Sequence, residues 1–426
     1  MSMSRRIAAV SVAAALTLSM AACSSPKKNA ETPAESGGQI TLTISTFNEF
    51  GYDNLFDEYM AQHPNIKIEH RKAAKADEAR QNLNTHLSAG SGLSDVVAAE
   101  GSWLPELMQY PDKFVDLSSP DVKGRWMEWK EAQAKDSNGH LLAYGTDSGP
   151  TAVCYRRDLF EKAGLPSDRE EVAKLLNGDW DNYFEVGRKF KQATGVPWYD
   201  SSISIYEGML SQVANAFENS DGTPIPLKDN AKIKETYDKI VSSLDISARY
   251  SAWSEDWTAA FQKDGFGTIL CPSWMLGVVE GNAAGVTGWD VANVFPGGGS
   301  NSGGSFLMVP TQSKHPEEAK AFADWLTAPE QQIKAFKTKG NFPSQVKALD
   351  DASLKDYSSP FFNNAPVGSI LIDRAKAVQV RVYAGPNYAS IRGVVGDALT
   401  RVETNVDDAD ASWKKALEAY DALGLE

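Results

Sequence analysis

Aromatic rings and carboxylates lie close to the ends of the secondary-structure elements that the sequence predicts. They are Trp253, Trp257 and Trp274 in one half of the chain, and Phe47, Glu49, Glu100 and Trp103 in the other. A flat aromatic ring packs on the apolar C–H face of a pyranose, and carboxylates accept hydrogen bonds from its hydroxyl groups. These residues agree with a sugar-binding cleft without requiring one, because each tryptophan taken alone could equally pack in a core.

A second candidate region is the run G-T-D-S-G-P-T-A-V-C-Y-R-R-D-L-F at residues 145–160, which we interpret as a crossing between two lobes. Residues 151–155 predict a strand, and a helix begins after it at Arg156. Asp147 and Tyr155 then lie near strand ends, where open α/β sheets bind their ligands. The alternative is that Asp147 caps a turn and Tyr155 fills a core, and this stretch alone leaves both interpretations open.

The carboxylates near aromatic residues also raise the hypothesis of an enzyme, since two carboxylates form the catalytic pair of a glycoside hydrolase. The chain lacks G-x-S-x-G, P-loop and H-E-x-x-H motifs, and its histidines show no metal-ligand spacing: His63, His70, His86, His140 and His315. We therefore predict a binding protein with no catalytic residues, metal or cofactor. A lipoprotein that binds a peptide or a metal ion is a further alternative, which fits the export signal described below but not the aromatic loops.

Length and charge limit the classes of protein further. A chain of 426 residues is too long for one ordinary core, so two lobes or domains are expected. The formal charge is −14, and without Arg5 and Arg6 it becomes −16, from 40 basic and 56 acidic residues. Such an acidic chain is repelled by phosphate backbones, so nucleic acid is not an expected partner.

The N-terminus has the pattern of a bacterial export signal. Arg5 and Arg6 precede an apolar run at residues 7–20, and Ala21-Ala22-Cys23 follows. We predict a signal peptide at residues 1–22, lipidation of Cys23, and a lipid-anchored flexible tether at residues 23–38, rich in Ser, Pro, Lys, Glu and Gly. The alternative is an ordinary cleaved signal with an incidental cysteine.

Cys154 and Cys271 are the two cysteines that remain, and export to an oxidising compartment permits a disulfide between them. Each lies at the end of a short apolar run, A-V-C-Y and T-I-L-C. If the two strands are neighbours in one sheet, we predict a bond that stabilises the protein by about 4 to 5 kcal/mol in the entropy model. Two buried free thiols are the alternative.

The elements that must position these residues follow an α/β order. A strand at residues 40–47, a helix that ends at Pro64 and a strand at residues 66–68 form a βαβ unit, and a third strand follows at residues 95–99. This order predicts a parallel sheet with its loops gathered at the carboxyl edge. The run G-G-G-S-N-S-G-G at residues 297–304 suits a second crossing, with a surface hairpin as the alternative, and residues 340–344 a third.

Three motifs carry a resemblance to a known family. They are the run S-K-H-P-E-E-A-K-A-F-A-D-W-L-T-A-P-E-Q-Q-I-K-A-F that ends at Phe336, the W-M-L-G at Trp274, and the crossing at residues 145–160. Together they resemble the extracellular solute-binding proteins of sugar ABC transporters, the maltose-binding-like group. The C-Y-R-R-D-L-F and C-P-S-W-M-L-G pair is most similar to the cellobiose and cello-oligosaccharide binding lipoproteins of Gram-positive bacteria.

The resemblance implies a periplasmic-binding-protein-like fold of two α/β lobes joined by three hinge crossings, with a ligand in the cleft. The lobes are expected at residues 39–146 with 300–343, and at 147–299 with 344–426. By resemblance Trp274 stacks on a sugar, and Trp257, Asp147 and Tyr155 face the cleft. The full predicted ligand-binding set is Phe47, Asn48, Glu49, Glu100, Trp103, Asp147, Tyr155, Trp253, Trp257, Trp274, Gly304, Asn341 and Phe342.

The implied function is that of the binding component of a sugar importer. It would capture an oligosaccharide, with a β-linked one such as a cello-oligosaccharide preferred, and deliver it to the membrane permease. The protein is expected to be a monomer on the extracellular face of the membrane, held there by its lipid anchor. A secreted lipoprotein that hydrolyses oligosaccharides is the alternative function.

Overall fold

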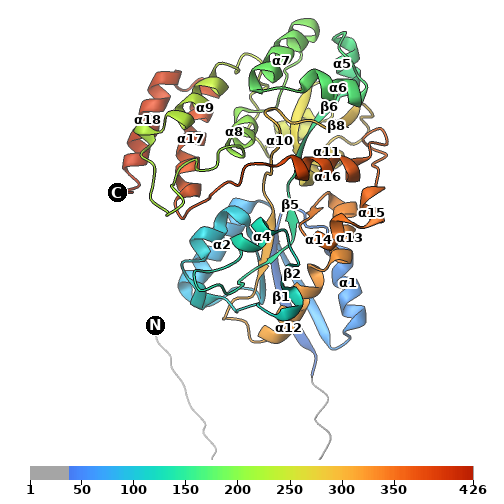
Figure 1. The fold of residues 1–426 in the computed structure, drawn as a ribbon, viewed down its shortest axis with the longest axis vertical. Coiled ribbons are helices and arrows are strands. Elements are labelled where there is room, and N and C mark those ends of the chain that lie inside the picture. Colours follow the sequence, from blue (N-terminus) through green and yellow to red (C-terminus); the bar gives the residue numbers. More distant parts are fainter. Residues whose placement is uncertain (1–37, 426) are drawn as a thin grey trace, which may run out of the picture. The chain divides into compact units, whose positions relative to one another are not determined.

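Residues 38–425 are described by a computed structural model, in which two sheets organise the chain from Gln39 onward (Figure 1). The first sheet has five strands in the order β2-β1-β3-β9-β4. Their bounds are Ile40–Phe47 (β1), Ile66–Ala73 (β2), Val96–Glu100 (β3), Tyr144–Gly145 (β4) and Ser305–Met308 (β9). β1 runs parallel to β2 and β3, as the sequence predicted, whereas β9 is antiparallel to β3 and β4. The prediction of a parallel sheet was therefore wrong for β9. This strand joins the sheet from a distant part of the chain and not through a βαβ crossover.

Helices cover both faces of this sheet. They are α1 (Asp53–Gln62), α2 (Ala76–Ala89), α3 (Leu104–Leu107), α4 (Glu128–Gln133) and α12 (Pro316–Leu326), with the short 3-10 helices η1 (Gly101–Trp103), η2 (Pro111–Lys113) and η3 (Pro120–Val122). From β1 the chain crosses to β2 on one side of it in the sheet, and from β2 it returns past β1 to β3 on the other side. Right-handed crossovers then place α1 and α2 on opposite faces, as Figure 1 shows.

The second sheet has three strands in the order β7-β6-β8, and both pairs are antiparallel. Its strands are Thr151–Arg156 (β6), Thr268–Pro272 (β7) and Trp289–Ala292 (β8). Every residue of β6 is buried, and alternate residues enter different cores. Val153 and Tyr155 pack in one core while Ala152 and Cys154 pack in the other, which is the two-residue period of a strand covered on both faces.

Most of the remaining helices surround this second sheet. They are α5 (Arg157–Lys162), α6 (Arg169–Leu176), α7 (Trp180–Thr194), α8 (Ser202–Leu210), η4 (Leu227–Asp229), α9 (Ala231–Val241), α10 (Glu255–Ala260), α11 (Ser273–Asn282), α14 (Val346–Leu349), α15 (Ala352–Lys355), α16 (Val367–Ala377), α17 (Tyr388–Glu403) and α18 (Ala409–Asp421). Helix α12 ends just before Ala328-Pro329, and α13 (Pro329–Lys339) follows it. Helix α13 belongs to both halves, since Ala335 packs in the core of the first sheet and Phe336 in a core of the second.

Three connections join the two sheets. The first runs from β4 through β5 (Asp147–Ser148) to β6, the second from β8 to β9, and the third passes through β10 (Phe342–Pro343), which pairs with β5. The Gly-rich run at residues 297–304 lies in the second connection, so the hairpin alternative was wrong. The first two connections touch, because the Gly149 amide donates to Asn301 Oδ1 at 2.9 Å and the Ser302 amide donates to the Gly149 carbonyl. A Cβ on Gly149 would lie 1.8 Å from the Ser302 carbonyl oxygen, so only glycine fits there.

The predicted disulfide is present. Cys154 on β6 and Cys271 on β7 are bonded, and their Cα atoms are 5.5 Å apart. The two cysteines are diagonal neighbours, because the register places Cys154 opposite Ile269 and Cys271 opposite Ala152. The predicted signal peptide, the lipidation of Cys23 and the tether up to residue 37 lie outside the described residues.

Candidate ligand-binding site

A large cavity between the two sheets has a volume of about 1040 Å³ and is lined by residues of both halves of the chain. From the first half come the ends of β1, β2 and β3, at Phe47, Lys72 and Glu100. Helices α8, α10, α11 and α17 face them from the second half. Since the cavity reaches the upper end of the usual size for ligand pockets, it could hold a ligand of several rings.

Ten of the thirteen predicted ligand-binding residues line this cavity: Phe47, Asn48, Glu49, Glu100, Asp147, Trp253, Trp257, Trp274, Gly304 and Asn341. They come from strand ends, from connections, from the segment before α10, and from α10 and α11 themselves, which carry Trp257 and Trp274. The tertiary structure thus brings into one cavity residues that lie almost 300 positions apart in the sequence.

Three predicted residues pack elsewhere. Tyr155 is fully buried in the core of the second half, and its hydroxyl donates to the Ser167 carbonyl at 2.7 Å. Trp103 is 4% exposed and packs against Phe47 with 5.1 Å between ring centroids. Phe342 is fully buried in the core that contains Phe336. These assignments to the cleft were wrong, because each side chain packs in a core. Ser102 and Asn341, next to Trp103 and Phe342, do line the cavity, whereas neither neighbour of Tyr155 does.

Three tryptophans form a cluster on one wall of the cavity. Trp253 stacks on Trp274 with 6.1 Å between ring centroids and 21° between planes, and it lies 5.1 Å from Trp257. Trp253 is 40% exposed, Trp274 is half-buried and Trp257 is buried. The Trp274 indole donates to the Ser302 carbonyl at 3.0 Å, which ties α11 to the second connection. The Trp257 indole donates to Asp200 Oδ2 at 2.9 Å, so the ring nitrogens of Trp257 and Trp274 both have protein partners and the cluster offers flat apolar faces to the cavity.

The segment that carries Trp253 has an unusual backbone. Arg249 and Trp253 both have positive φ, at 60° and 68°, and Asn48 across the cavity has φ 49°. Residues with side chains rarely adopt this conformation, and such strained residues gather at functional sites. All three line the large cavity, which supports it as the functional site.

Asp147 lines the cavity and links the first connection to the second. Its Oδ1 accepts hydrogen bonds from the Thr146 hydroxyl at 2.7 Å and from the Ser305 amide at 2.8 Å. Gly304, just before Ser305, has φ 107°, and a Cβ there would lie 2.9 Å from the Asp147 carbonyl oxygen. The Asp147 carboxylate therefore accepts a backbone hydrogen bond, as the turn interpretation expected. The donor, however, is Ser305, which lies in a different connection far along the sequence.

A buried lysine lies beneath the same crossings. Lys130 on α4 is 1% exposed, and its Nζ is 3.7 Å from the centroid of the Phe306 ring. Burial lowers the pKa of Lys130 to about 7, although the charges of Asp147 and Glu100 act in the opposite direction. A lysine so placed can carry a charge that depends on pH in the neutral range.

Ion pairs occupy two edges of the cavity. Glu49 accepts a hydrogen bond from Lys72 at 2.5 Å, and Lys339 at the end of α13 is 3.7 Å away. Across the cavity, Glu207 on α8 pairs with Arg392 on α17 at 3.2 Å. All these charged side chains are partly exposed, so their pairing contributes little to stability and leaves donors and acceptors that a polar ligand could use.

Several lining residues were missed by the sequence analysis, including Tyr52, Glu207, Tyr250, Tyr388 and Arg392. Tyr388 and Arg392 lie on α17, near the C-terminus, where the sequence shows only an amphipathic helix. Their four-residue spacing places them on one face of that helix, but no local pattern indicates which face lies toward the cavity.

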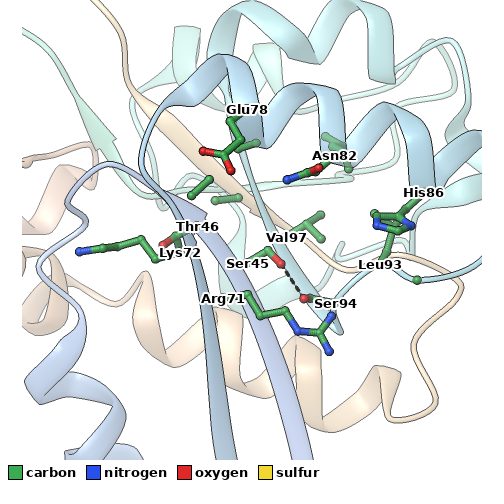
Figure 2. Close-up of a pocket in the computed structure, with 15 residues that line it drawn as sticks. Ser45, Thr46, Arg71, Lys72, Glu78, Asn82, His86, Leu93, Ser94 and Val97 are labelled. Carbon is green, nitrogen blue, oxygen red and sulfur yellow. Dashed lines mark hydrogen bonds between the residues drawn. The ribbon is translucent and has the colours of Figure 1, made fainter. Parts of the chain in front are cut away.

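A smaller cavity of about 350 Å³ lies between α2 and the first sheet (Figure 2). Figure 2 shows Arg71 beside the Ser45–Ser94 hydroxyl pair, with Glu78, Asn82 and His86 on α2. None of its lining residues is a tryptophan, tyrosine or phenylalanine. The larger cavity is therefore the better candidate for the functional site.

Within residues 38–425 no cluster of three or more His, Cys, Asp or Glu side chains has the arrangement of a metal site. In the same range no helix has both the length and the apolar character needed to cross a membrane.

The family is shown by comparison with known proteins. A family model for bacterial extracellular solute-binding proteins matches residues 54–362, which is more than half of the chain. The chain belongs to the bacterial extracellular solute-binding proteins. As a member of this family, it is assigned a binding role rather than a catalytic one.

Curated relatives of this solute-binding protein are distant in sequence but similar in length. It is 26% identical over 412 residues to an arabinooligosaccharide-binding protein of Bacillus subtilis (strain 168), covering 90% of this chain and 92% of the relative. It is also 26% identical over 338 residues to a lactose-binding protein of Rhizobium radiobacter, covering 75% of each chain.

Solved structures agree on the fold. A crystal structure of an extracellular solute-binding protein family 1 member is 47% identical, with a TM-score of 0.80, over 90% of this chain and 99% of the other. A binding protein of B. animalis subsp. lactis Bl-04, in complex with β-1,6-galactobiose, has a TM-score of 0.77 at 21% identity, over 91% and 97%. The likeness confirms the predicted fold of two α/β lobes.

Proposed function

We propose that this protein is the substrate-binding component of an ABC sugar importer, which captures an oligosaccharide in the large cavity and delivers it to the membrane permease. The observation that carries the proposal is the cluster of Trp253, Trp257 and Trp274, which faces Glu49 and Glu100 across a cavity of about 1040 Å³. Stacked rings on one wall and carboxylates on the other match the apolar face and the hydroxyl rim of a sugar.

The preferred ligand is a β-linked oligosaccharide such as a cello-oligosaccharide. β-1,4-linked chains present flat faces, which suit neighbouring aromatic platforms. Relatives named for arabino-oligosaccharides and for lactose make those sugars the first competitors to compare.

Calorimetric titration tests the proposal directly. The mature protein is titrated with cello-, xylo-, manno-, malto- and arabino-oligosaccharides of two to five rings, and with lactose. We expect saturable binding with one site per chain, tightest for a β-linked sugar. The absence of heat with every sugar would contradict an oligosaccharide ligand, and tighter binding of maltotriose than of cellotriose would contradict the preferred linkage.

The hydrolase alternative is tested by incubating the protein with cellobiose and measuring free glucose. Family membership favours binding, so we expect no glucose above the level of a buffer control. Release of glucose in proportion to protein concentration would support the alternative.

We also propose that a lipid anchors the protein to the membrane and that the chain divides into two lobes. Lipidation of Cys23 after removal of residues 1–22 would hold the monomer at the extracellular face of the membrane, with residues 23–38 as a flexible tether. Replacing Cys23 with Ser should release the protein into the culture medium. The two lobes are proposed at residues 39–146 with 300–343 and at 147–299 with 344–426.

A further inference from the structure

A buried carboxylate lies behind the tryptophan cluster. Asp200 is 1% exposed, and its Oδ2 accepts a hydrogen bond from the Trp257 indole Nε1 at 2.9 Å. Its Oδ1 accepts one from the Ser204 hydroxyl. Within residues 38–425 no lysine, arginine or histidine forms a salt bridge with Asp200, so this charge is held by hydrogen bonds alone. A carboxylate buried in this way is costly, which is a reason to look for a role beyond packing.

The backbone around Asp200 also holds the segment that carries Trp253. The Tyr250 amide donates to the Asp200 carbonyl at 3.1 Å, and the Ala248 amide donates to the Tyr199 carbonyl at 2.8 Å. At the end of the segment, the Ser254 hydroxyl caps α10 by accepting from the Trp257 amide. Hydrogen bonds therefore hold residues 248–254 at both ends. Asp200 contacts Tyr250 near the start of the segment and Trp257 just beyond its end.

A second buried carboxylate fixes the start of this segment. Glu403 is 5% exposed and accepts from the Ser202 amide at 2.9 Å, the Ser202 hydroxyl at 2.7 Å and the Ser247 hydroxyl at 2.6 Å. Its own carbonyl accepts from Arg249 Nη1 at 2.7 Å. With the start of the segment held by Glu403, the hydrogen bond from Trp257 to Asp200 fixes the ring that Trp253 contacts at 5.1 Å between centroids.

We propose that Asp200 is a positioning residue for ligand binding: its carboxylate orients the Trp257 indole, and through Trp257 it sets the platform that Trp253 and Trp274 present to the cavity. Asp200 does not line the cavity, so it acts through Trp257 and not by contact with ligand. The inference rests on the proposed function, since it takes the tryptophan cluster to be the binding platform. A carboxylate acceptor is stronger than a neutral one, so the ring should be held best when Asp200 is charged.

The surroundings of Asp200 make that charge sensitive to pH. Burial raises the pKa of Asp200 to about 6, and Glu403 on α17 adds to the increase, while hydrogen bonds from Ser204 and Trp257 oppose it. The other titratable groups near it are the phenols of Tyr183 and Tyr199. Both remain neutral at this pH, because burial raises their own pKa values above the usual range. We therefore expect the platform to loosen as the pH falls through 6.

The first experiment needs no sugar. Protein labelled with ¹⁵N-tryptophan gives indole N–H signals in NMR, and the Trp257 signal is the one that disappears in Trp257→Phe. We expect this signal to shift with pH with a midpoint near 6 in the wild type, and to stay constant across the same range in Asp200→Asn. A Trp257 signal that does not move between pH 5 and 8, or moves equally in Asp200→Asn, would overturn the inference.

The second experiment measures affinity at pH 7.5, using whichever of cellotriose, xylotriose, lactose and arabinotriose binds the wild type most tightly. Asp200→Leu should weaken binding by about 5- to 30-fold, as expected for a lost charge-assisted hydrogen bond. Asp200→Asn keeps an acceptor oxygen and should stay within about 3-fold of the wild type, with no further loss at pH 5.5. In a Trp257→Phe background, Asp200→Leu should cause no additional loss, because the hydrogen bond is already absent.

The matched control is Asp290→Asn. Asp290 is also 1% exposed, but it pairs with Arg169 and neither residue lines the cavity, so its loss should lower stability without changing affinity. Equal losses of affinity in Asp290→Asn and Asp200→Leu would show a general effect of instability and overturn the inference. If no sugar in the panel binds the wild type, the proposed function fails, and the NMR titration alone decides whether Asp200 orients Trp257.

Discussion

At the residue scale, Trp274 is the side chain with the clearest expected contribution to affinity. It is half-buried at the start of α11, lines the cavity and stacks on Trp253. Replacing Trp274 with Ala should weaken sugar binding by about 1 to 3 kcal/mol, the scale of aromatic hot spots in interfaces. Calorimetric titration with cellotriose measures the loss, and thermal unfolding should remain cooperative.

Trp413→Ala is the control for this variant. Trp413 is also half-buried, but it packs against Tyr237 and does not line the cavity. Its loss should lower stability and leave affinity unchanged. If Trp274→Ala instead bound the sugar normally and melted at a much lower temperature, Trp274 would be a core residue.

Lys130 should make stability depend on pH. Its pKa is lowered to about 7 in the folded protein, chiefly by burial, so between pH 7 and about 10.5 the unfolded chain binds more protons than the folded one. This contribution to the free energy of unfolding rises with pH across that window, so it is lost progressively as the pH falls from about 10.5 to 7. Urea unfolding from pH 6.5 to 10 should show that Lys130→Met removes a rise on the order of a few kcal/mol.

Lys135→Met provides the comparison. Lys135 follows the same helix but is exposed and pairs with Glu131. Its removal should leave the pH dependence of stability as in the wild type. A Lys130→Met protein with the same pH profile as the wild type would mean that Lys130 keeps its ordinary pKa.

At the scale of elements, the disulfide fixes β6 to β7, the strand that leads into α11 and Trp274. It closes a loop with a sequence separation of 117, for which the entropy model gives about 4 to 5 kcal/mol. Replacing both Cys154 and Cys271 with Ala should lower the free energy of unfolding by up to about this amount, because the paired strands still restrict the chain. Urea unfolding measures it.

Thiol counting checks the bond itself. A protein that starts at Ser24 lacks Cys23, so in denaturant it should show no free thiol before reduction and two afterwards. Two reactive thiols without reductant would contradict the bond.

At the scale of the whole molecule, we expect the two lobes to close on the sugar. The cavity is lined from both sides, and the connections between the lobes include glycines with positive φ, such as Gly303 and Gly304. A ligand that contacts both lobes makes its second set of contacts only in the closed state, and this difference in affinity shifts the equilibrium. Small-angle scattering should show a smaller radius of gyration at saturating cellotriose.

The control for closure is Trp274→Ala at a sugar concentration too low to saturate it. Its scattering should match that of the free wild type. An unchanged profile for the wild type at demonstrated saturation would describe a rigid binding protein, in which the three connections serve only as links.

The sequence predicted structure correctly where the pattern depends on residues that are close together in the chain. The strand at residues 40–47 and the apolar runs around Cys154 and Cys271 predicted observed elements, because each of these patterns depends on neighbouring residues. Composition and motifs also predicted the two-lobe α/β fold and the family. Most candidate ligand residues reached the cavity because they lie at strand ends and in connections between the sheets.

Only the tertiary structure decided which side of each element faces the cavity. Tyr155 points into a core since alternate residues of β6 enter different cores, and the sequence of a strand buried on both faces does not distinguish them. Arg392 and Asp200 were missed for the same reason, as their positions depend on contacts with Glu207 and Trp257 from distant parts of the chain. The sequence alone determined the elements and the aromatic and acidic residues available, while packing between distant segments determined which of them meet at the site.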